Sequence, residues 1–422
     1  MDKRTATGRK GGQMNAEIKA VRPPMRGGTG TEGLSPIQRK FPTVEDLRRK
    51  ARARVPRFAF DFVDGGCLDN LCRDSNRKAL DSLRMVPRYG LGGVALSSEV
   101  ELFGRRYAAP IGVAPMGMGG LIWPNAERHI AAAMQGLGLP FVLATPATAS
   151  IEEIAAIAPD VFWSQLYGAP LDDNRITFDL VDRAKRAGAH ALVVTIDSPV
   201  RGKRPQDMRN GVAVPFRKDL RSLTDIARSP AWAWEVLRHG APRCENFVAY
   251  AEGSTSVDAI GKLVQKHLRG GFEWETVKRV RDRWVGPMLV KGILAPEDAE
   301  IALEIGADGI VVSNHGGRAF DAAPPAIEML PAIVAVAGHK ATIMLDSGIR
   351  SGLDVTRALA LGAKAVLAGR PFLFGVAALG GSGAGHAGEL FIDEIRGAMG
   401  QIGAVSPGDV PGAVKLDVPG RR

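Results

Sequence analysis

The chain has 422 residues, of which 45% are hydrophobic, and a formal net charge of +10. A chain of this length can bury a large core, and a barrel can exceed about 250 residues as one domain. No apolar run reaches the roughly 18 residues that span a bilayer, and the N-terminus shows no apolar core of a secretory signal. Three cysteines, Cys67, Cys72 and Cys244, lack metal-ligand spacing. We therefore expect a reduced, cytoplasmic protein without a bound metal.

The positive charge is concentrated in two segments. Residues 1–40 hold nine Lys and Arg against three acids, and residues 201–243 hold ten against four. The first segment is rich in glycine and poor in apolar residues, which predicts a disordered basic tail. Because the excess does not lie on a folded face with interleaved aromatics, we expect no nucleic-acid binding.

Beyond the tail, a helix is predicted to start at Thr43, where a capping residue precedes Glu45 and Asp46. From residue 108 onward, short apolar runs alternate with helical patterns such as residues 151–158 and 296–305. The runs are rich in Val, Ile and Leu and continuous rather than alternating, which is typical of strands buried on both faces. They are residues 110–114, 140–144, 161–165, 191–195, 288–291, 309–312, 342–345 and 365–368.

Eight such units predict an α/β fold, a closed (β/α)8 TIM barrel with a helical N-terminal cap. An open doubly wound sheet is the alternative, but it would need a Gly-x-Gly-x-x-Gly turn, and residues 116–120 (MGMGG) lack that spacing. The segment between the fourth and fifth apolar runs, residues 196–287, is much longer than a usual strand-to-helix connection. The predicted domains are therefore a tail at 1–40, a barrel at 41–405 with an insert at about 199–270, and a C-terminal tail at 406–422.

Polar residues follow six of the eight runs, at the strand ends where barrel enzymes carry their reactive groups. Each residue alone could be explained as a buried amide, a surface cation or a helix cap, but six sites converging on one mouth favour function. They are Gln165, Tyr167, Thr195, Asp197, Lys291, Ser313, His315, Arg318, Asp346, Gly348, Arg350, Gly369 and Arg370.

The turn Ser313–Arg318 (SNHGGR) sets a titratable imidazole three residues from a permanent cation. This pair suits chemistry beside a carboxylate, since His moves protons and the guanidinium fork binds acids. The last two strands end in residues 346–350 (DSGIR) and 368–370 (AGR). Glycine amides beside arginines at these strands predict a phosphate site, without distinguishing flavin, nucleotide or sugar phosphate.

From about Phe41 to Ile402 the sequence resembles the FMN-dependent 2-hydroxy-acid dehydrogenases and oxidases, the family of glycolate oxidase, L-lactate dehydrogenase and (S)-mandelate dehydrogenase. The matching motifs occur in order along the chain. They are PIGVAP (110–115), SQLY (164–167), TID (195–197), LVKG (289–292), SNHGGR (313–318), DSGIR (346–350) and AGR (368–370). The resemblance implies oxidation of an L-2-hydroxy acid to a 2-oxo acid with FMN as the cofactor.

The family also implies residue roles. His315 would take the substrate hydroxyl proton, Asp197 would stabilise the resulting imidazolium, and Tyr167 would bond the reacting oxygen. Arg318 and Arg204 would clamp the substrate carboxylate. Lys291 would offset the charge that builds on the reduced flavin. The remaining flavin contacts would come from Pro115, Met116, Gly117, Gln165, Thr195, Ser313, Asp346, Gly348, Arg350, Gly369 and Arg370.

The chain departs from the family pattern in three places. Phe60-Asp61-Phe62 replaces a Tyr-Asp-Tyr run, so Phe62 cannot donate the hydrogen bond that a tyrosine gives the carboxylate, and the pocket should be more apolar. Ala144, next to Thr145, replaces a serine. Gly117 stands where oxidases tend to carry alanine, which favours a dehydrogenase over an oxidase that releases hydrogen peroxide.

The insert, with Trp232 and Trp234, resembles the mandelate and lactate dehydrogenase branch, in which it binds the membrane surface and electrons pass to quinones. A basic, Trp-containing segment suits an anionic bilayer, although an oligomer contact or a mobile lid is the alternative. The family further implies a homotetramer. A non-catalytic flavin-binding or nucleic-acid-binding protein is the alternative from another class. Phe62 and the insert favour a bulky or aromatic hydroxy acid.

Overall fold

The computed structural model describes residues 34–90, 96–200, 202–212, 219–268, 271–413 and 416–417. The predicted tail therefore lies mostly outside the described residues. Helix α1 (Pro36–Lys40) occupies its last five positions, where Ser35 and Gln38 form a capping box, so these residues are helical rather than disordered. The residues from Ser35 onward form a single compact unit.

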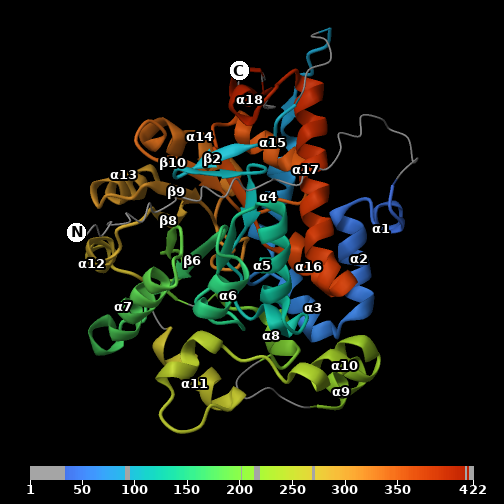
Figure 1. Cartoon of the computed structure of the whole chain (residues 1–422), viewed down its shortest axis with the longest axis vertical. Helices are drawn as coiled ribbons and strands as arrows, with labels where there is room; N and C mark the ends of the chain where they lie inside the picture. Colours follow the sequence, from blue (N-terminus) through green and yellow to red (C-terminus); the bar gives the residue numbers. More distant parts are fainter. Residues whose placement is uncertain are drawn as a thin grey trace, which may run out of the picture. The chain divides into compact units, whose positions relative to one another are not determined.

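Eight parallel strands close into a barrel in the order β10-β11-β4-β5-β6-β7-β8-β9, with β9 pairing β10 (Figure 1). All eight predicted runs form these strands, so the predicted (β/α)8 barrel is confirmed and the open sheet is wrong. The strands are β4 (Ile111–Val113), β5 (Phe141–Leu143), β6 (Phe162–Leu166), β7 (Leu192–Thr195), β8 (Met288–Ile293), β9 (Gly309–Val312), β10 (Thr342–Leu345) and β11 (Ala365–Ala368).

Helices follow the strands and cover the outside of the barrel. They are α5 (Ala126–Leu137), α6 (Ile151–Ile157), α7 (Leu171–Arg186), α12 (Trp274–Arg283), α13 (Pro296–Glu304), α14 (Ala326–Ala337), α15 (Gly352–Ala360) and α16 (Arg370–Leu379), followed by α17 (Gly383–Ile402). Gly188, Gly306 and Gly362, which follow the ends of α7, α13 and α15, all have positive φ, the conformation that ends helices.

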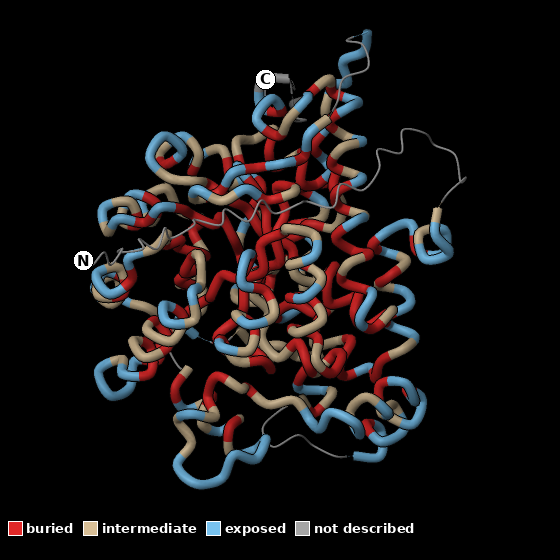
Figure 2. Tube along the Cα trace, viewed as in Figure 1, coloured by how far each residue is buried: buried red, intermediate tan, exposed pale blue. Residues whose placement is uncertain are grey.

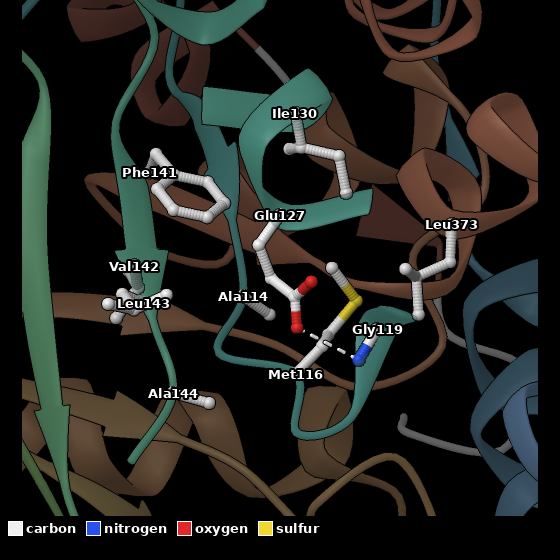
Figure 3. A pocket seen from close by; sticks show the side chains of 10 residues that line it. All are labelled: Ala114, Met116, Gly119, Glu127, Ile130, Phe141, Val142, Leu143, Ala144 and Leu373. Carbon is white, nitrogen blue, oxygen red and sulfur yellow. Dashed lines mark hydrogen bonds between the residues drawn. The ribbon is translucent and has the colours of Figure 1, made fainter. Parts of the chain in front are cut away.

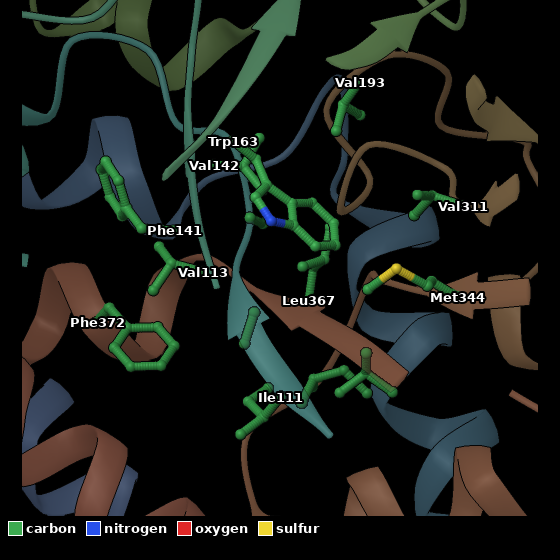
Figure 4. Close-up of a cluster of buried hydrophobic side chains, with 14 of the residues drawn as sticks. Ile111, Val113, Phe141, Val142, Trp163, Val193, Val311, Met344, Leu367 and Phe372 are labelled. Atoms are coloured by element: carbon green, nitrogen blue, oxygen red, sulfur yellow. The ribbon is translucent and has the colours of Figure 1, made fainter. Parts of the chain in front are cut away.

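The core fills the barrel and the space between the strands and the helices. Figure 4 shows side chains from β4, β5, β6, β7, β9, β10 and β11 in one cluster, with Phe372 of α16 beside them. Almost every residue of the eight barrel strands is buried, because both faces of the barrel sheet are covered. This explains why the runs are continuously apolar.

An antiparallel hairpin, β2 (Val100–Leu102) and β3 (Arg105–Tyr107), lies at the N-terminal end of the barrel. The tip residue Phe103 comes so close to the first residue of β9 that a Cβ at Gly309 would lie 2.9 Å from Cζ of Phe103. Trp163 of β6 is fully buried and donates its Nε1 hydrogen to the Tyr107 hydroxyl at 2.9 Å. The hairpin therefore closes the end of the barrel opposite the strand C-termini.

The predicted helical cap consists of α2 (Val44–Arg54), α3 (Arg57–Asp64) and α4 (Leu71–Ser82). Thr43 caps α2 through a capping box with Asp46, as its sequence predicts. Of the expected C-terminal tail at 406–422, the structure describes residues 406–413 and 416–417. A 3-10 turn η4 (Pro407–Asp409) and α18 (Val410–Ala413) precede β12 (Leu416–Asp417), which pairs with β1 (Arg84–Met85).

The insert after β7 contains α8 (Pro205–Arg209), α9 (Leu220–Ala227), α10 (Pro230–His239), the 3-10 helix η2 (Glu245–Tyr250) and α11 (Val257–His267). Trp232 fixes α10 to the barrel, since its Nε1 donates to the Leu121 carbonyl at 3.2 Å and its ring meets Phe58 edge-on. The outer side of the insert is largely exposed (Figure 2). Among the described helices, none has the length and apolarity needed to cross a bilayer.

Candidate active site at the barrel mouth

His315 lies between a tyrosine and an aspartate from two other strand ends. Its Nε2 is 3.0 Å from the Tyr167 hydroxyl and its Nδ1 is 2.9 Å from Oδ1 of Asp197. An ionised carboxylate only accepts hydrogen bonds, so Nδ1 carries the hydrogen and the lone pair of Nε2 accepts from the Tyr167 hydroxyl. The ring is thus oriented and its tautomer is set for accepting a proton at Nε2.

Lys291 is a buried cation beside Asp197, and its side chain is only 3% exposed. Its Nζ donates to the Ser313 hydroxyl at 2.9 Å and lies 3.3 Å from Oδ2 of Asp346 and 3.9 Å from Oδ2 of Asp197. Burial alone would lower the pKa of Lys291, but these two carboxylates raise it above its ordinary value. Likewise, burial would raise the pKa of Asp197, yet Lys291 and His315 bring it below its usual range. Both groups are therefore charged at neutral pH.

The predicted carboxylate clamp is assembled around one aromatic ring. The guanidinium carbons of Arg318 and Arg204 each lie 5.3 Å from the centre of the Phe62 ring. Arg318 donates to the carbonyls of Phe62 and Gly65 at 2.8 and 2.9 Å, while Arg204 pairs with Asp207 at 3.1 Å. Burial, and then the nearby Arg204, lower the pKa of Arg318 to about 9. Two cations share one acid here, which favours binding of an anion.

Arg350 and Arg370 form a second cationic group, half-buried, at the ends of β10 and β11. Arg370 donates to three carbonyls, those of Val63, Gly65 and Gly316, at 2.8–3.0 Å. Burial, and then Arg350 and Arg318, set the pKa of Arg370 well below its ordinary value. Burial, and then Arg77, lower the pKa of Arg350 to about 10. Desolvated cations that repel one another would be relieved by a bound anion such as a phosphate.

Two orphaned polar atoms point to a further ligand. Nε2 of Gln165 and Oγ1 of Thr195 are buried and have no hydrogen-bond partner. Gln165 is fixed from the other side, since its Oε1 accepts from the Thr145 amide at 3.0 Å. A buried unpaired polar group costs about 1–3 kcal/mol, so both atoms fit a polar ligand at the barrel mouth, as the edge of a flavin ring would provide.

The loop after β4 supplies Pro115, Met116 and Gly117. Met116 lines a small pocket beside Ala114 and Ala144, and Figure 3 shows its thioether close to Glu127 and Gly119. A Cβ added at Gly369 would lie 2.9 Å from the Met116 sulfur, and one at Gly117 would lie 2.8 Å from Cγ of Pro146. A larger residue at Gly369 or Gly117 would therefore require the Met116 or Pro146 side chain to shift.

Sequence reasoning missed several residues that hold these groups. Glu127 accepts from the amides of Gly119 and Thr148 at 3.0 and 2.9 Å and joins the loops after β4 and β5. The Ser347 hydroxyl accepts from the Gly316 amide at 3.0 Å and donates to Asp346 at 2.7 Å. Ser347 stands inside the predicted 346–350 motif and could have been found there, whereas nothing in the sequence singles out Glu127. Gly348 (φ 89°) lies against α4, where its Cβ would be 3.0 Å from Cβ of Asn76.

Comparisons with known proteins identify the family of the chain. The family described as FMN-dependent dehydrogenase matches residues 51–415. The chain is 40% identical to an L-lactate dehydrogenase of Caulobacter vibrioides (strain NA1000 / CB15N), over 86% of this chain and 94% of the relative. It is 39% identical to an L-lactate dehydrogenase of Vibrio cholerae serotype O1 (strain M66-2), over 86% of this chain and 95% of the relative.

Solved structures give the same result. The crystal structure of the monotopic membrane protein (S)-mandelate dehydrogenase superposes with a TM-score of 0.84 at 34% identity, covering 89% of this chain and 99% of that one. A mandelate oxidase superposes with a TM-score of 0.76 at 37% identity, covering 90% and 99%. The expected family and cofactor are thereby confirmed: the chain belongs to the FMN-dependent dehydrogenase family and is an FMN-dependent α-hydroxy acid dehydrogenase.

Proposed function

We propose that His315 is the base that takes the hydroxyl proton of an L-2-hydroxy acid as it is oxidised to the 2-oxo acid. The main support for this proposal is the position of the His315 ring between Tyr167 and Asp197, which makes Nε2 the acceptor nitrogen. Once protonated, the imidazolium is stabilised by the Asp197 carboxylate at 2.9 Å. Tyr167 would bond the reacting oxygen, a role that the position of its hydroxyl beside the same Nε2 supports.

Arg318 and Arg204 are proposed to bind the substrate carboxylate. Arg318 supplies a desolvated guanidinium, and a carboxylate would restore the charge balance that burial has disturbed. Phe62 supports the two cations from its ring and offers no hydroxyl. The clamp thus consists of two guanidinium groups against an apolar wall.

FMN, when bound, would accept the hydrogen and electron pair that leave the substrate carbon. Gln165, Thr195, Lys291 and Ser313 would hold its ring edge, since two of them carry the unpaired buried atoms and Lys291 carries the cation. Its phosphate would be held by Gly348, Arg350, Gly369 and Arg370, its ribityl chain by Asp346, and its ring face by Pro115, Met116 and Gly117. Tyr167, Asp197 and His315 remain free for the substrate side.

The substrate that we propose is a bulky or aromatic L-2-hydroxy acid. Phe62 supplies an aromatic ring at the carboxylate clamp, in place of a hydrogen-bonding tyrosine. The relatives named above carry the names of L-lactate and (S)-mandelate enzymes, so these two acids bracket the size range to be tested. A preference for L-lactate over (S)-mandelate would contradict this part of the proposal.

For the electron acceptor, we propose a quinone reached from a membrane surface, with the insert as the contact. Leu220, Trp234 and Leu237 on α9 and α10 are 79%, 61% and 78% exposed, on a segment rich in arginine. Such a combination suits the interface of an anionic bilayer. The enzyme would then be cytoplasmic and peripheral on the inner face of the cell membrane. An oxidase is the second candidate, since mandelate oxidases share the fold.

We also propose a homotetramer, and a catalytic domain at 41–405 between the two terminal segments. Sedimentation velocity of the holoenzyme would test the oligomeric state.

The decisive experiment is anaerobic reduction of the flavin. The purified holoenzyme should be yellow and should bleach with (S)-mandelate or L-lactate, whereas His315→Ala should keep FMN and fail to bleach. Unchanged single-turnover reduction in His315→Ala would contradict the role of His315. Oxygen uptake with hydrogen peroxide release, at rates that match those with a quinone, would favour the oxidase.

A further inference from the structure

We propose that Asn76 is a positioning residue: it pairs with Asn314 and thereby holds the loop that carries His315 and Arg318 against helix α4. The inference rests on the roles proposed above for His315 and Arg318. The two asparagines are 238 positions apart, yet Asn76 Nδ2 donates to Asn314 Oδ1 at 2.9 Å and Asn314 Nδ2 donates to Asn76 Oδ1 at 2.8 Å. Their exposures are 1% and 2%.

Both asparagine side chains also bond to backbone groups of the loop and of the first residue of α14. Asn76 Oδ1 also accepts from the Ala326 amide at 3.1 Å. Asn314 Oδ1 accepts from the Gly317 amide at 3.2 Å, and Asn314 Nδ2 donates to the Pro324 carbonyl at 2.9 Å. Both carboxamide oxygens therefore bind two donors, and a buried network with every member paired specifies one geometry.

The loop needs such a constraint because its backbone is strained. His315, Gly316 and Gly317 have φ values of 59°, 66° and 72°. For a residue with a side chain, this left-handed region costs about 1–2 kcal/mol, so His315 stays there only if its surroundings hold it. Asn314 immediately precedes these three residues.

Helix α4 and the segment that leads into it, residues 65–70, form the surface against which the loop is held. A Cβ added at Gly317 would lie 2.4 Å from the Arg73 amide nitrogen, and the Gly317 carbonyl accepts from the Cys67 amide at 2.9 Å. Asp321, after the loop, accepts from the amides of Asp69 and Cys72. Asn76 bonds to Asn314 and Ala326 rather than to the His315 ring or the Arg318 guanidinium. It therefore affects the chemistry only through the position of the loop.

The test compares the holoenzyme with Asn76→Ala and Asn76→Asp. In Asn76→Asp an oxygen replaces the amide donor and faces Asn314 Oδ1. The rate constant of anaerobic flavin reduction at saturating (S)-mandelate or L-lactate should fall about 10- to 100-fold, as misplacement by about 1 Å can cause, with FMN affinity unchanged. In the apoprotein, hydrogen exchange at the Gly317 and Ala326 amides should quicken.

Tyr107→Phe is the matched control. It removes the acceptor of the buried Trp163 hydrogen bond at the far end of the barrel, so it should lower Tm without changing the reduction rate constant. The double variant Asn76→Ala/Asn314→Ala should lose less than the product of the two single losses, because both changes remove the Asn76–Asn314 pair.

Reduction at the wild-type rate in both Asn76 variants, or a double variant whose loss equals the product of the single losses, would overturn the inference. If Asn76→Ala does not fold, Asn76→Ser carries the same measurements. A wild-type flavin that no hydroxy acid reduces would refute the proposed function instead. The amide exchange rates would still decide whether Asn76 holds the loop.

Discussion

Oδ1 of Asp197 lies 2.9 Å from Nδ1 of His315, and this contact dictates which imidazole nitrogen can act as the base. The other carboxylate oxygen faces the Lys291 ammonium at 3.9 Å. The Asp197 carboxylate thus lies between the proposed proton acceptor, His315, and the Lys291 ammonium, and its charge stabilises both.

Asp197→Asn should therefore keep FMN and lose most of the reduction rate. An amide at this position can donate to Nδ1 and so favour the tautomer that carries its hydrogen on Nε2. A loss of about 10³- to 10⁴-fold is the size expected when a catalytic His–Asp pair takes the wrong tautomer. Stopped-flow reduction measures it, with Asp182→Asn, a surface partner of Arg283, as the control. A rate within a few-fold of wild type would refute the tautomer argument.

Arg350→Met should separate stability from cofactor binding. The Arg350 guanidinium donates to the neighbouring Ile349 carbonyl and is desolvated beside other cations. Its removal should leave the apoprotein at least as stable, while FMN affinity falls about 10- to 100-fold, as for the loss of a charged hydrogen bond of about 1.5–3 kcal/mol. Urea unfolding and FMN titration measure the two effects.

Arg357→Met gives the opposite pattern and serves as the control. Arg357 pairs at 2.9 Å with Asp354, which is fully buried, so its loss should destabilise the apoprotein and leave FMN affinity unchanged. Equal destabilisation by the two variants would contradict the interpretation of Arg350 as part of an anion site.

Phe62→Tyr should tighten substrate binding. The new hydroxyl would add one hydrogen bond near the clamp, worth about 0.5–1.5 kcal/mol, or roughly 2- to 10-fold in the substrate Kd. Phe62→Leu should weaken binding, since it removes the ring that both guanidinium groups contact. The Kd from the substrate dependence of flavin reduction measures both. Weaker binding by the tyrosine variant would show that Phe62 does not border the carboxylate.

Replacing Leu220, Trp234 and Leu237 together by serine should abolish sedimentation with anionic liposomes at low salt and leave flavin reduction unchanged. These side chains supply the exposed apolar surface of the insert. The control replaces Tyr89 and Val285, which are 74% and 79% exposed outside the insert. If the wild-type protein stays in the supernatant, the insert is not a membrane contact.

His190 should make the fold acid-sensitive. Burial, and then the charge of Arg105, lower its pKa from 6.5 to about 4. Between these two values the unfolded chain binds a proton that the folded chain excludes, so stability is lost as pH falls from about 6.5 to 4. Urea unfolding at pH 7.5 and 5 should show a smaller difference in His190→Phe than in wild type. The exposed His339→Gln should match wild type, and a matching slope in His190→Phe would refute the assignment.

The barrel could be predicted because its strands are buried on both faces, which leaves continuous apolar runs such as 309–312. The hairpin β2–β3 could not, since three-residue strands with one exposed face, as in Val100–Leu102, carry too short a pattern. At the site, His315, Lys291 and Arg318 could be predicted, because they stand at or just after the ends of predicted strands and within family motifs. The residues that hold them could not be predicted. Asn76 pairs with Asn314, which is 238 positions away, and Glu127 belongs to no recognisable motif.

Helix α4 meets the loops after β9 and β10 at two glycines: a Cβ at Gly317 would lie 2.4 Å from the Arg73 backbone nitrogen, and one at Gly348 would lie 3.0 Å from side-chain atoms of Asn76 and Leu80. At these contacts neither segment can move toward the other without a clash. The N-terminal helices and the barrel must therefore come from the same protein. A chimera that takes residues 41–90 from one relative and the barrel from another would misalign the reactive loop even with every catalytic side chain retained.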